Sequence, residues 1–509
     1  MNKYFSILNE HFENLVNEID ITTEKFISYK SCPKDVDLIN RTRSDFLSEI
    51  QVQKIQIIQK FQNENFQIQN KSELIKHDLF KDNFSFLLHV KDKFSLRLVL
   101  VILDWYLSEE CFKKFKQPYS KIKDTLIFET EADDFQVSNK TNTIDLLDKN
   151  IEQILAFDKF KNLEFLDLSK NLIKNIEKGT FDELKTLQKL IIECNNLKFI
   201  DEHLFDNLTG LKYLDLNDNQ IANLKPSTFI HLNNLIELFL SENKIEIIET
   251  DLFKNLKNLR RLDLSLNLIV QIDECAFKNL TNLQYLYLNW NNLPTISPNC
   301  FSDLVELKEL QLEKNYIERI VPEWFINLKN LSKFFVNNNF IEMIDRNSFK
   351  YLYSLKTLNL SYNRIRFFEE NSLLNLTNLR KLYIRGNSIE VITDGMFNGL
   401  FNLVSLCLDE NKIGIIEDNS FKDLKNLKIL SLRKNYLSEL KWSNLSGLIE
   451  LERLIVQNNL ISSIEIKIFQ MTPKIQEVDI RVNRLNNIDD LAKQINECVL
   501  SENFTLKTR

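Results

Sequence analysis

Residues that could carry out catalysis are few in this chain and lie far apart. Seven glycines occur, and none of them builds a phosphate-binding loop such as GxxxxGK or GxGxxG. No pair of histidines has the spacing of a metal site or of a catalytic triad; the histidines are His11, His77, His89, His203 and His231. We therefore expect a protein that is not an enzyme and that uses neither a cofactor nor a metal.

The cysteines offer one candidate nucleophile. Cys407 stands where a strand would expose it, but no histidine is predicted on the neighbouring strands to activate it, so we interpret it as a small apolar residue. The seven cysteines are scattered and odd in number, a distribution that favours a reducing compartment: Cys32, Cys111, Cys194, Cys275, Cys300, Cys407 and Cys498.

Composition and net charge argue against nucleic acid and a membrane span. The chain has 509 residues, of which 27% are charged, and its net charge is -7, whereas proteins that bind nucleic acid are normally basic. No secretory signal is evident at the amino terminus, and the most apolar run, 94–107, is too short to span a bilayer. We expect a cytoplasmic protein without a membrane span that binds no nucleic acid, with an extracellular location as the alternative.

A repeat of 24 residues supplies the elements that would position binding residues. From Leu163 to Ile475 the pattern LxxLxLxxNxIxxIxxxxFxxLxx opens fourteen times in register, and position nine is asparagine every time, from Asn171 to Asn483. A side chain that both donates and accepts hydrogen bonds at a tight bend explains the asparagine, because aspartate cannot donate and leucine can do neither. These asparagines are predicted to be structural.

Position nineteen is phenylalanine in eleven of thirteen repeats, with Leu373 and Leu445 as the exceptions. We expect these rings to stack as a spine inside the convex side, because no single repeat could bury that much apolar area alone.

The pattern resembles the leucine-rich repeat family, in its 24-residue "typical" class, over about residues 144–488. The resemblance implies an α/β repeat solenoid: a horseshoe with a parallel sheet on its concave face and irregular or short helical segments outside. It also implies protein binding on that sheet, although the fold alone does not fix the function. Secreted members of the class usually close their ends with cysteine clusters, and this chain departs from that habit.

The chain divides around this array. We assign 141–488 to the solenoid, which opens with a degenerate half-repeat at 144–154, and 489–509 to a cap helix and tail, with Asp489 and Asp490 capping the helix.

The residues before the array are predicted to be mainly helical. An apolar seam indicates a helical hairpin or coiled coil in 1–66, which either packs within the chain or mediates self-association, and 67–140 is a mostly helical segment of unknown family.

Aromatic residues mark the middle of the predicted concave face. Counted from the leucine that opens each repeat, positions two, three, five, seven and eight should face outward there. Across repeats four to ten, position five is aromatic in every second strand. We predict that a protein partner contacts these rings and a nearby arginine, although strand propensity alone could also explain them. The candidate binding residues are Phe239, Tyr285, Tyr287, Trp290, Phe335, Tyr362, Tyr383 and Arg385.

Charge divides the same face. In repeats one to four these positions hold seven acids and three lysines, and in repeats ten to fourteen they hold eight bases and five acids. Such a gradient would orient a partner of opposite polarity.

These patterns predict a non-enzymatic scaffold or adaptor that binds a protein on the concave face of its repeats. One alternative is a secreted or cell-surface recognition protein of the same fold. The other is a substrate adaptor or regulatory subunit of an enzyme complex that docks through the first 140 residues.

Overall fold

The computed structural model describes residues 142–154, 156–499 and 504–508. The chain divides into two units after Thr130, and the description concerns the second of them. The helical segments predicted in 1–66 and 67–140, and self-association through them, lie outside the described residues. No helix in the described part of the chain combines the length and the apolar character needed to cross a bilayer.

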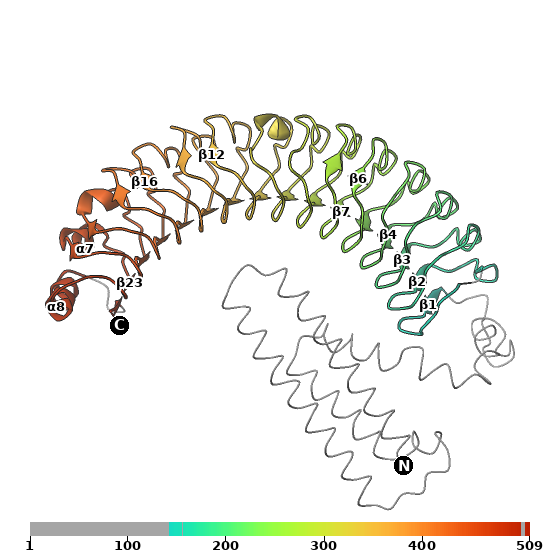
Figure 1. The fold of residues 1–509 in the computed structure, drawn as a ribbon, viewed down its shortest axis with the longest axis horizontal. Helices are drawn as coiled ribbons and strands as arrows, with labels where there is room; N and C mark the ends of the chain where they lie inside the picture. The colour runs from blue at the N-terminus through green and yellow to red at the C-terminus, as the bar shows by residue number, and fades with distance from the viewer. Residues whose placement is uncertain (1–141, 155, 500–503, 509) are drawn as a thin grey trace, which may run out of the picture. The chain divides into compact units, whose positions relative to one another are not determined.

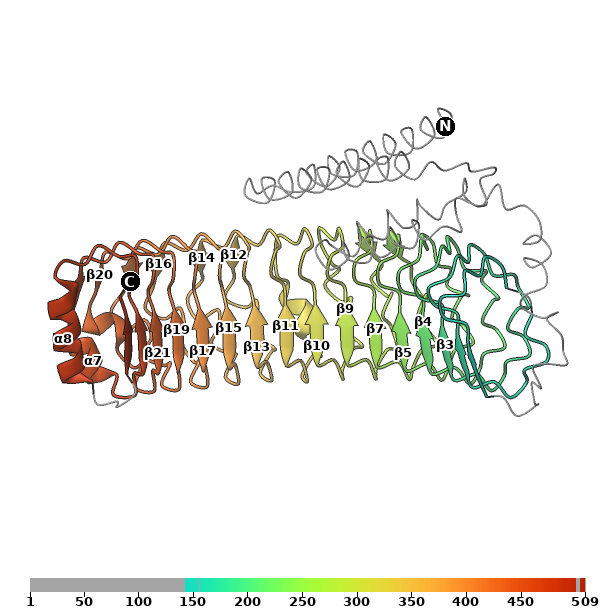
Figure 2. The same cartoon turned by 90° about the horizontal axis from the view of Figure 1, so that it is seen from below.

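One parallel sheet of sixteen strands lines the inner side of the arc of repeats (Figure 1). Its strands lie side by side in chain order, as Figure 2 shows. Each strand has three residues, and in the repeats these come from positions three to five. The strands are β1 (Thr143–Asp145), β2 (Phe165–Asp167), β3 (Lys189–Ile191), β4 (Tyr213–Asp215), β5 (Glu237–Phe239), β7 (Arg261–Asp263), β9 (Tyr285–Tyr287), β10 (Glu309–Gln311), β11 (Lys333–Phe335), β13 (Thr357–Asn359), β15 (Lys381–Tyr383), β17 (Ser405–Cys407), β19 (Ile429–Ser431), β21 (Arg453–Ile455), β23 (Glu477–Asp479) and β24 (Thr505–Lys507).

Short elements lie outside this sheet. Two-stranded sheets are formed by β6 (Ile247–Ile248) with β8 (Gln271–Ile272), β12 (Met343–Ile344) with β14 (Phe367–Phe368), β16 (Val391–Ile392) with β18 (Ile415–Ile416), and β20 (Glu439–Leu440) with β22 (Ser463–Ile464). The helices are η2 (Pro322–Phe325), η3 (Trp442–Leu445), α7 (Lys467–Met471) and α8 (Ile488–Cys498). The predicted solenoid with short helical segments outside its sheet is therefore confirmed.

The sequence pattern fixes the register of the main sheet. Leu286 at position four aligns with Leu262 on one side and with Leu310 on the other, and all three side chains are fully buried. Because successive side chains of a strand point to opposite faces, positions three and five of the same strands face outward. The aligned leucines thus dictate which side chains form the concave surface.

The asparagine at position nine joins neighbouring repeats as predicted. The Nδ2 of Asn291 donates to the carbonyl of Leu288 at 3.1 Å within its own repeat and to that of Leu264 at 2.9 Å in the preceding repeat. Its Oδ1 accepts from the amide of Ile269 at 2.9 Å. Both halves of the amide are therefore needed, and neither aspartate nor leucine could replace it.

The phenylalanine spine is confirmed as well. The ring of Phe253 stacks on Phe229 and on Phe277, with both pairs of centroids 6.2 Å apart, and Phe301 continues the stack at 6.0 Å from Phe277. All four rings are at most 1% exposed. Their burial against one another couples each repeat to the next.

The carboxyl-terminal end differs from its prediction in two respects. The N-cap position of α8 is held by Asn487, in a left-handed conformation and without a capping hydrogen bond from its side chain, whereas Asp489 and Asp490 lie within the first helical turn. There the acids interact favourably with the helix dipole and do not cap the helix. The tail was not predicted to be a strand, but its residues form β24, which pairs with β23.

Candidate functional site

The candidate aromatic residues at position five form one row across the sheet, which we call the central row: Phe239, Tyr287, Phe335 and Tyr383. In the parallel register Asp263 stands between Phe239 and Tyr287. Gln311 and Asn359 take the equivalent places farther along the row. The four rings are half-buried, so each presents part of its surface to a partner.

Tyr285, at position three, shares a cation with the central row. The guanidinium carbon of Arg261 lies 5.1 Å from the ring centroid of Tyr285 and 5.9 Å from that of Tyr287. Burial, followed by the charge of Glu309, raises the pKa of Tyr287. The two tyrosines and the arginine therefore form one preassembled group on the sheet.

Two other candidate residues, Trp290 and Tyr362, lie at position eight, and we call them the rim row. Both have left-handed backbone conformations, with φ of 56° and 53°, in the bend that follows each strand. Trp290 is 51% exposed and Tyr362 is 43% exposed, more than any ring of the central row. The ammonium of Lys314 lies 4.7 Å from the centroid of the Trp290 ring.

Arg385, the last candidate residue, lies against the rim row. Its guanidinium carbon is 5.4 Å from the ring centroid of Tyr362, and its Nη2 is 3.1 Å from Oε1 of Glu410. The neighbouring Gly386 lies directly under the tyrosine, because a Cβ there would approach Cδ1 of Tyr362 to 2.5 Å. The structure therefore brings Tyr362 and Arg385 together, as it does Tyr285 and Tyr287.

Exposed apolar residues at positions ten and twelve were missed by the sequence analysis. Leu268 and Val270 are 44% and 48% exposed, and the Tyr316 ring lies 5.5 Å from that of Phe340. Arg364 covers Phe340, with its guanidinium carbon 4.2 Å from the ring centroid. Positions ten and twelve alternate with the buried positions nine and eleven, so their side chains should point to solvent. Apolar residues at positions ten and twelve, where other repeats carry polar ones, could therefore have predicted this exposed group.

Acids outnumber bases on the amino-terminal half of the concave face. We call six of them the acidic patch: Glu193, Asp215, Asp218, Glu237, Glu242 and Asp263. No ion pair joins them to a base of the described residues; Lys189 lies instead over the Tyr213 ring, 4.3 Å from its centroid. Burial raises the pKa of Asp215 and of Asp263, despite hydrogen bonds that act in the opposite direction.

Two polar atoms at the centre of the face have no hydrogen-bond partner. They are Oδ1 of Asn289 and Oε2 of Glu313, which belong to position seven of adjacent repeats, and both atoms are buried. Burial, followed by the charge of Glu309, raises the pKa of Glu313 to about 7. Both atoms are acceptors, and a donor from a partner would satisfy them.

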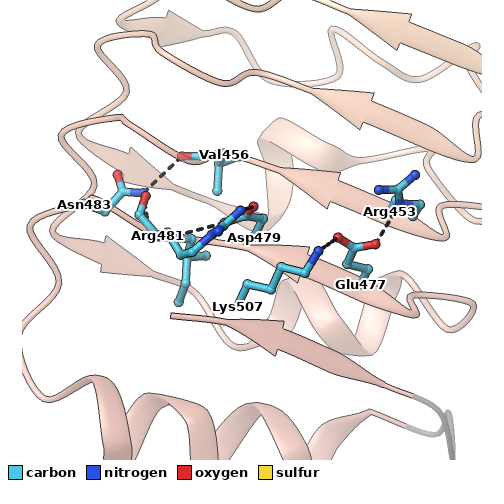
Figure 3. A network of polar contacts seen from close by, with 8 residues as sticks. Arg453, Val456, Glu477, Asp479, Arg481, Asn483 and Lys507 are labelled. Carbon is cyan, nitrogen blue, oxygen red and sulfur yellow. Dashed lines mark hydrogen bonds and ion pairs between the residues drawn. The ribbon is translucent and has the colours of Figure 1, made fainter. Parts of the chain in front are cut away.

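The carboxyl-terminal half of the face is neutralised within the chain, so the predicted surplus of bases is largely paired. Glu477 accepts from Arg453 at 2.8 Å and from Lys507 at 2.6 Å, and Asp479 pairs with Arg481 at 2.6 Å (Figure 3). Further pairs join Arg385 and Lys434 to Glu410, Lys428 to Glu452, and Lys333 to Glu309. Hydrogen bonds from Arg385 and Lys434 lower the pKa of Glu410 to about 2.

Cys407, His203 and His231, which lie within the described part of the chain, do not assemble into a reactive group; His11, His77 and His89 lie outside it. Burial, followed by the charge of Asp409, raises the pKa of Cys407 to about 11, so its thiol stays protonated and poorly nucleophilic at neutral pH. His203 and His231 both approach Asp206, at 3.0 Å and 3.9 Å, a proximity that their spacing did not predict. Among the described residues, no cluster of three or more histidine, cysteine, aspartate or glutamate side chains could hold a metal ion.

Several solved structures share the fold. TLR13 in complex with ssRNA13 is 26% identical, with a TM-score of 0.57 over 70% of this chain and 49% of that one. A leucine-rich repeat protein of Leptospira interrogans is 25% identical, with a TM-score of 0.56 over 72% of this chain and 96% of that one. Toll of Drosophila in complex with Spatzle is 23% identical, with a TM-score of 0.55 over 66% and 50%, and shows the fold alone.

The chain spans about half the length of the TLR13 and Toll chains that it matches. It matches no curated protein. The model of the leucine rich repeat family matches it nine times, in overlapping segments that together cover residues 161–460. Those matches extend over more than half of the chain and coincide with the stacked strands of the main sheet, so the chain belongs to the leucine-rich repeat family.

Proposed function

We propose that the chain is a non-enzymatic scaffold or adaptor that binds a protein partner on the concave face, through the central row, the rim row, Tyr285 and Arg385. The observation that carries this proposal is the exposure of aromatic rings on a sheet whose core is already complete. The leucines at position four are buried without help from these rings, so the rings are not required to cover them.

The chemistry of the rings favours a protein as the partner. Tryptophan, tyrosine and arginine dominate binding energy at protein interfaces, because they bury a large area and keep a polar end. Here Trp290, Tyr285 and Tyr362 each have a cation of the chain over the ring, so these groups are held in place before a partner arrives. Preorganisation of this kind lowers the entropy lost on binding.

RNA is a poorer candidate partner for this face. TLR13, a fold neighbour, forms a complex with ssRNA13. In this chain the acidic patch would repel phosphate, and most bases of the carboxyl-terminal half are paired with acids. Proteins that bind RNA need bases free to contact phosphates.

Proximity labelling in the source cells tests the proposal. Full-length wild type is compared with the variant Tyr287→Ala/Trp290→Ala and with the matched control Tyr353→Ala/Trp442→Ala. The control removes a tyrosine and a tryptophan that are 54% and 37% exposed outside the concave sheet, and Trp442 also carries a cation, Lys467. A discrete set of proteins should disappear only with the concave variant. Loss of the same set with both variants, or with neither, would contradict the proposal.

The same experiment addresses the compartment. We propose a reducing one, since the five cysteines of the described residues are free thiols. Extracellular neighbours in the labelled set would support the recognition-protein alternative instead. A catalytic subunit that disappears on deletion of residues 1–140 would support the role in an enzyme complex.

A further inference from the structure

Two acids of the acidic patch, Asp215 and Asp263, lie on one line across the sheet with the central row. Read along β4, β5, β7 and β9, position five holds Asp215, Phe239, Asp263 and Tyr287 in turn. Acids and rings thus alternate from strand to strand. Neighbouring parallel strands lie about 4.8 Å apart, so each kind of side chain recurs about every 9.6 Å along this line.

The two halves of the concave face differ in how many of their acids form ion pairs. Seven ion pairs lie on the concave face from β10 to β24, whereas the described concave positions from β2 to β9 contain none. Two bases of the first half, Lys189 and Arg261, lie over tyrosine rings, and the charge of Arg261 also acts on Asp263. An acidic surface without ion pairs of its own attracts a cationic partner.

A second observation comes from hydrogen bonding and does not depend on the number of acids. Oδ1 of Asn289 and Oε2 of Glu313 are buried acceptors that lack donors, and they lie next to the Tyr287 end of the same line. Buried polar atoms without partners are rare in native proteins. Acids and acceptors on this part of the face favour a partner that offers donors, and lysine and arginine side chains have donors only.

The spacing along the line selects the conformation of the partner. In a polyproline II helix the chain rises about 3.1 Å per residue and completes a turn in three residues, so a side chain returns to the same side about every 9.3 Å. A regular β-strand returns every two residues, after about 6.6 Å, which does not match the line.

On these grounds, and resting on the proposed function, we propose that repeats three to seven of the concave face bind an extended basic segment of a protein partner. Lysine or arginine recurs at every third residue of that segment and faces the acids, and a neighbouring apolar residue faces Phe239 and Tyr287.

Fluorescence anisotropy with the full chain tests this inference. The probe is a labelled peptide of five Arg-Leu-Pro triplets. One comparison peptide has the same composition with its arginines gathered at one end, and another has glutamate in place of arginine. The triplet peptide should bind at least about tenfold more tightly than either comparison peptide. Equal affinity for the triplet peptide and the rearranged peptide would show that the spacing of the arginines does not matter and would overturn the inference.

Matched variants separate a specific surface from general attraction between a polycation and an acidic protein. Asp263→Asn/Glu313→Gln removes two acids from the proposed surface and keeps one acceptor oxygen on each side chain. Glu177→Gln/Glu323→Gln removes two exposed acids from the outer loops. The first variant should weaken binding of the triplet peptide about tenfold and the second less than about twofold, with circular dichroism unchanged in both. Equal weakening would overturn the inference.

The same assay tests RNA as the competing occupant, and proximity labelling separates a failure of this inference from a failure of the proposed function. Single-stranded RNA should not displace the peptide; displacement by RNA at lower concentration than by unlabelled peptide would identify RNA as the occupant and overturn the inference. If the peptide does not bind, while the proximity-labelled partners still depend on Tyr287 and Trp290, the inference fails and the proposed function stands.

Discussion

Glu313 has an environment that opposes its charge, and it lies within the proposed binding face. Burial is the main reason for its raised pKa, and the nearby Glu309 adds repulsion. Its Oε2 has no hydrogen-bond donor. Ionisation of Glu313 therefore lowers the stability of the folded chain, and a neutral residue at this position would not.

Ionisation of Glu313 should make the stability of the folded chain depend on pH. The carboxyl group of Glu313 titrates near 4.5 when unfolded and at about 7 when folded, so ionisation destabilises the fold progressively over this interval and fully above it. Glu313→Gln should raise the free energy of unfolding by about 3 kcal/mol at pH 8 and change it little at pH 4.5. Urea denaturation at the two pH values measures this. An equal effect at both would show that the carboxyl group is not perturbed.

At the scale of elements, the repeats are joined by hydrogen bonds that differ in burial. Asn291, at position nine, is 5% exposed and bonds to the backbone of two repeats. An exposed series of asparagines lies at position twenty-four, where for example the Nδ2 of Asn282 donates to the carbonyl of Lys257 at 2.8 Å. Both series of asparagines are visible in the sequence. Because buried asparagines occur only in the series at position nine, we expect the hydrogen bonds of that series to contribute more to stability.

This comparison gives the second prediction. Asn291→Ala should lower the free energy of unfolding by about 2–3 kcal/mol, because it leaves buried amide and carbonyl groups without partners. Asn282→Ala should lower it by less than about 1 kcal/mol, because water replaces the lost bond. Denaturant unfolding of the two variants beside wild type provides the measurement, and similar losses for both would contradict the role assigned to position nine.

The elements also explain which parts of the site were predictable. The central row followed from the sequence because the leucines of position four determine which face of each strand is outward. The pairing of Arg453 and Lys507 with Glu477 could not be predicted from the sequence, because Lys507 comes from a strand that has no repeat motif. The exposure of Leu268 and Val270 was missed because the alternation continues beyond the strand into the bend.

At the scale of the whole solenoid, the ends must close a core that would otherwise be open to water. At the carboxyl end, Ile495 of α8 is fully buried, and β24 adds the last strand to the sheet. At the amino end, Ile151 and Ile154 are each 7% exposed, as their place in an opening half-repeat predicts. Terminal caps of this kind are required because each repeat contacts only its neighbours.

The third prediction follows from this arrangement. Truncation after Asn487 removes α8 and β24, exposes the last repeats and deprives Glu477 of Lys507. Hydrogen exchange should accelerate at least about tenfold in β21 and β23, while β5 to β9 stay unchanged, because stability in a repeat array is passed between neighbours. Uniform acceleration along the solenoid would show instead that the array unfolds as one unit.

The charge distribution is also a property of the whole solenoid. Among the described residues, the six acids of the acidic patch form no ion pair, whereas most acids on the second half of the concave face are paired with bases. A partner that binds along the face should therefore dock its basic part toward the first half. Its association rate should fall about tenfold or more between 50 and 500 mM salt, as stopped-flow mixing would show. A rate independent of salt would exclude steering by this face.

The central claim is that a protein partner lies on the concave face. The most direct measurement is photo-crosslinking in the source cells from a light-activated phenylalanine analogue placed at position 287, with position 353 as the control outside the concave sheet. We predict a discrete crosslinked protein from position 287 and none of the same mass from position 353. Crosslinking of that protein from position 353 alone would place the partner elsewhere and contradict the account.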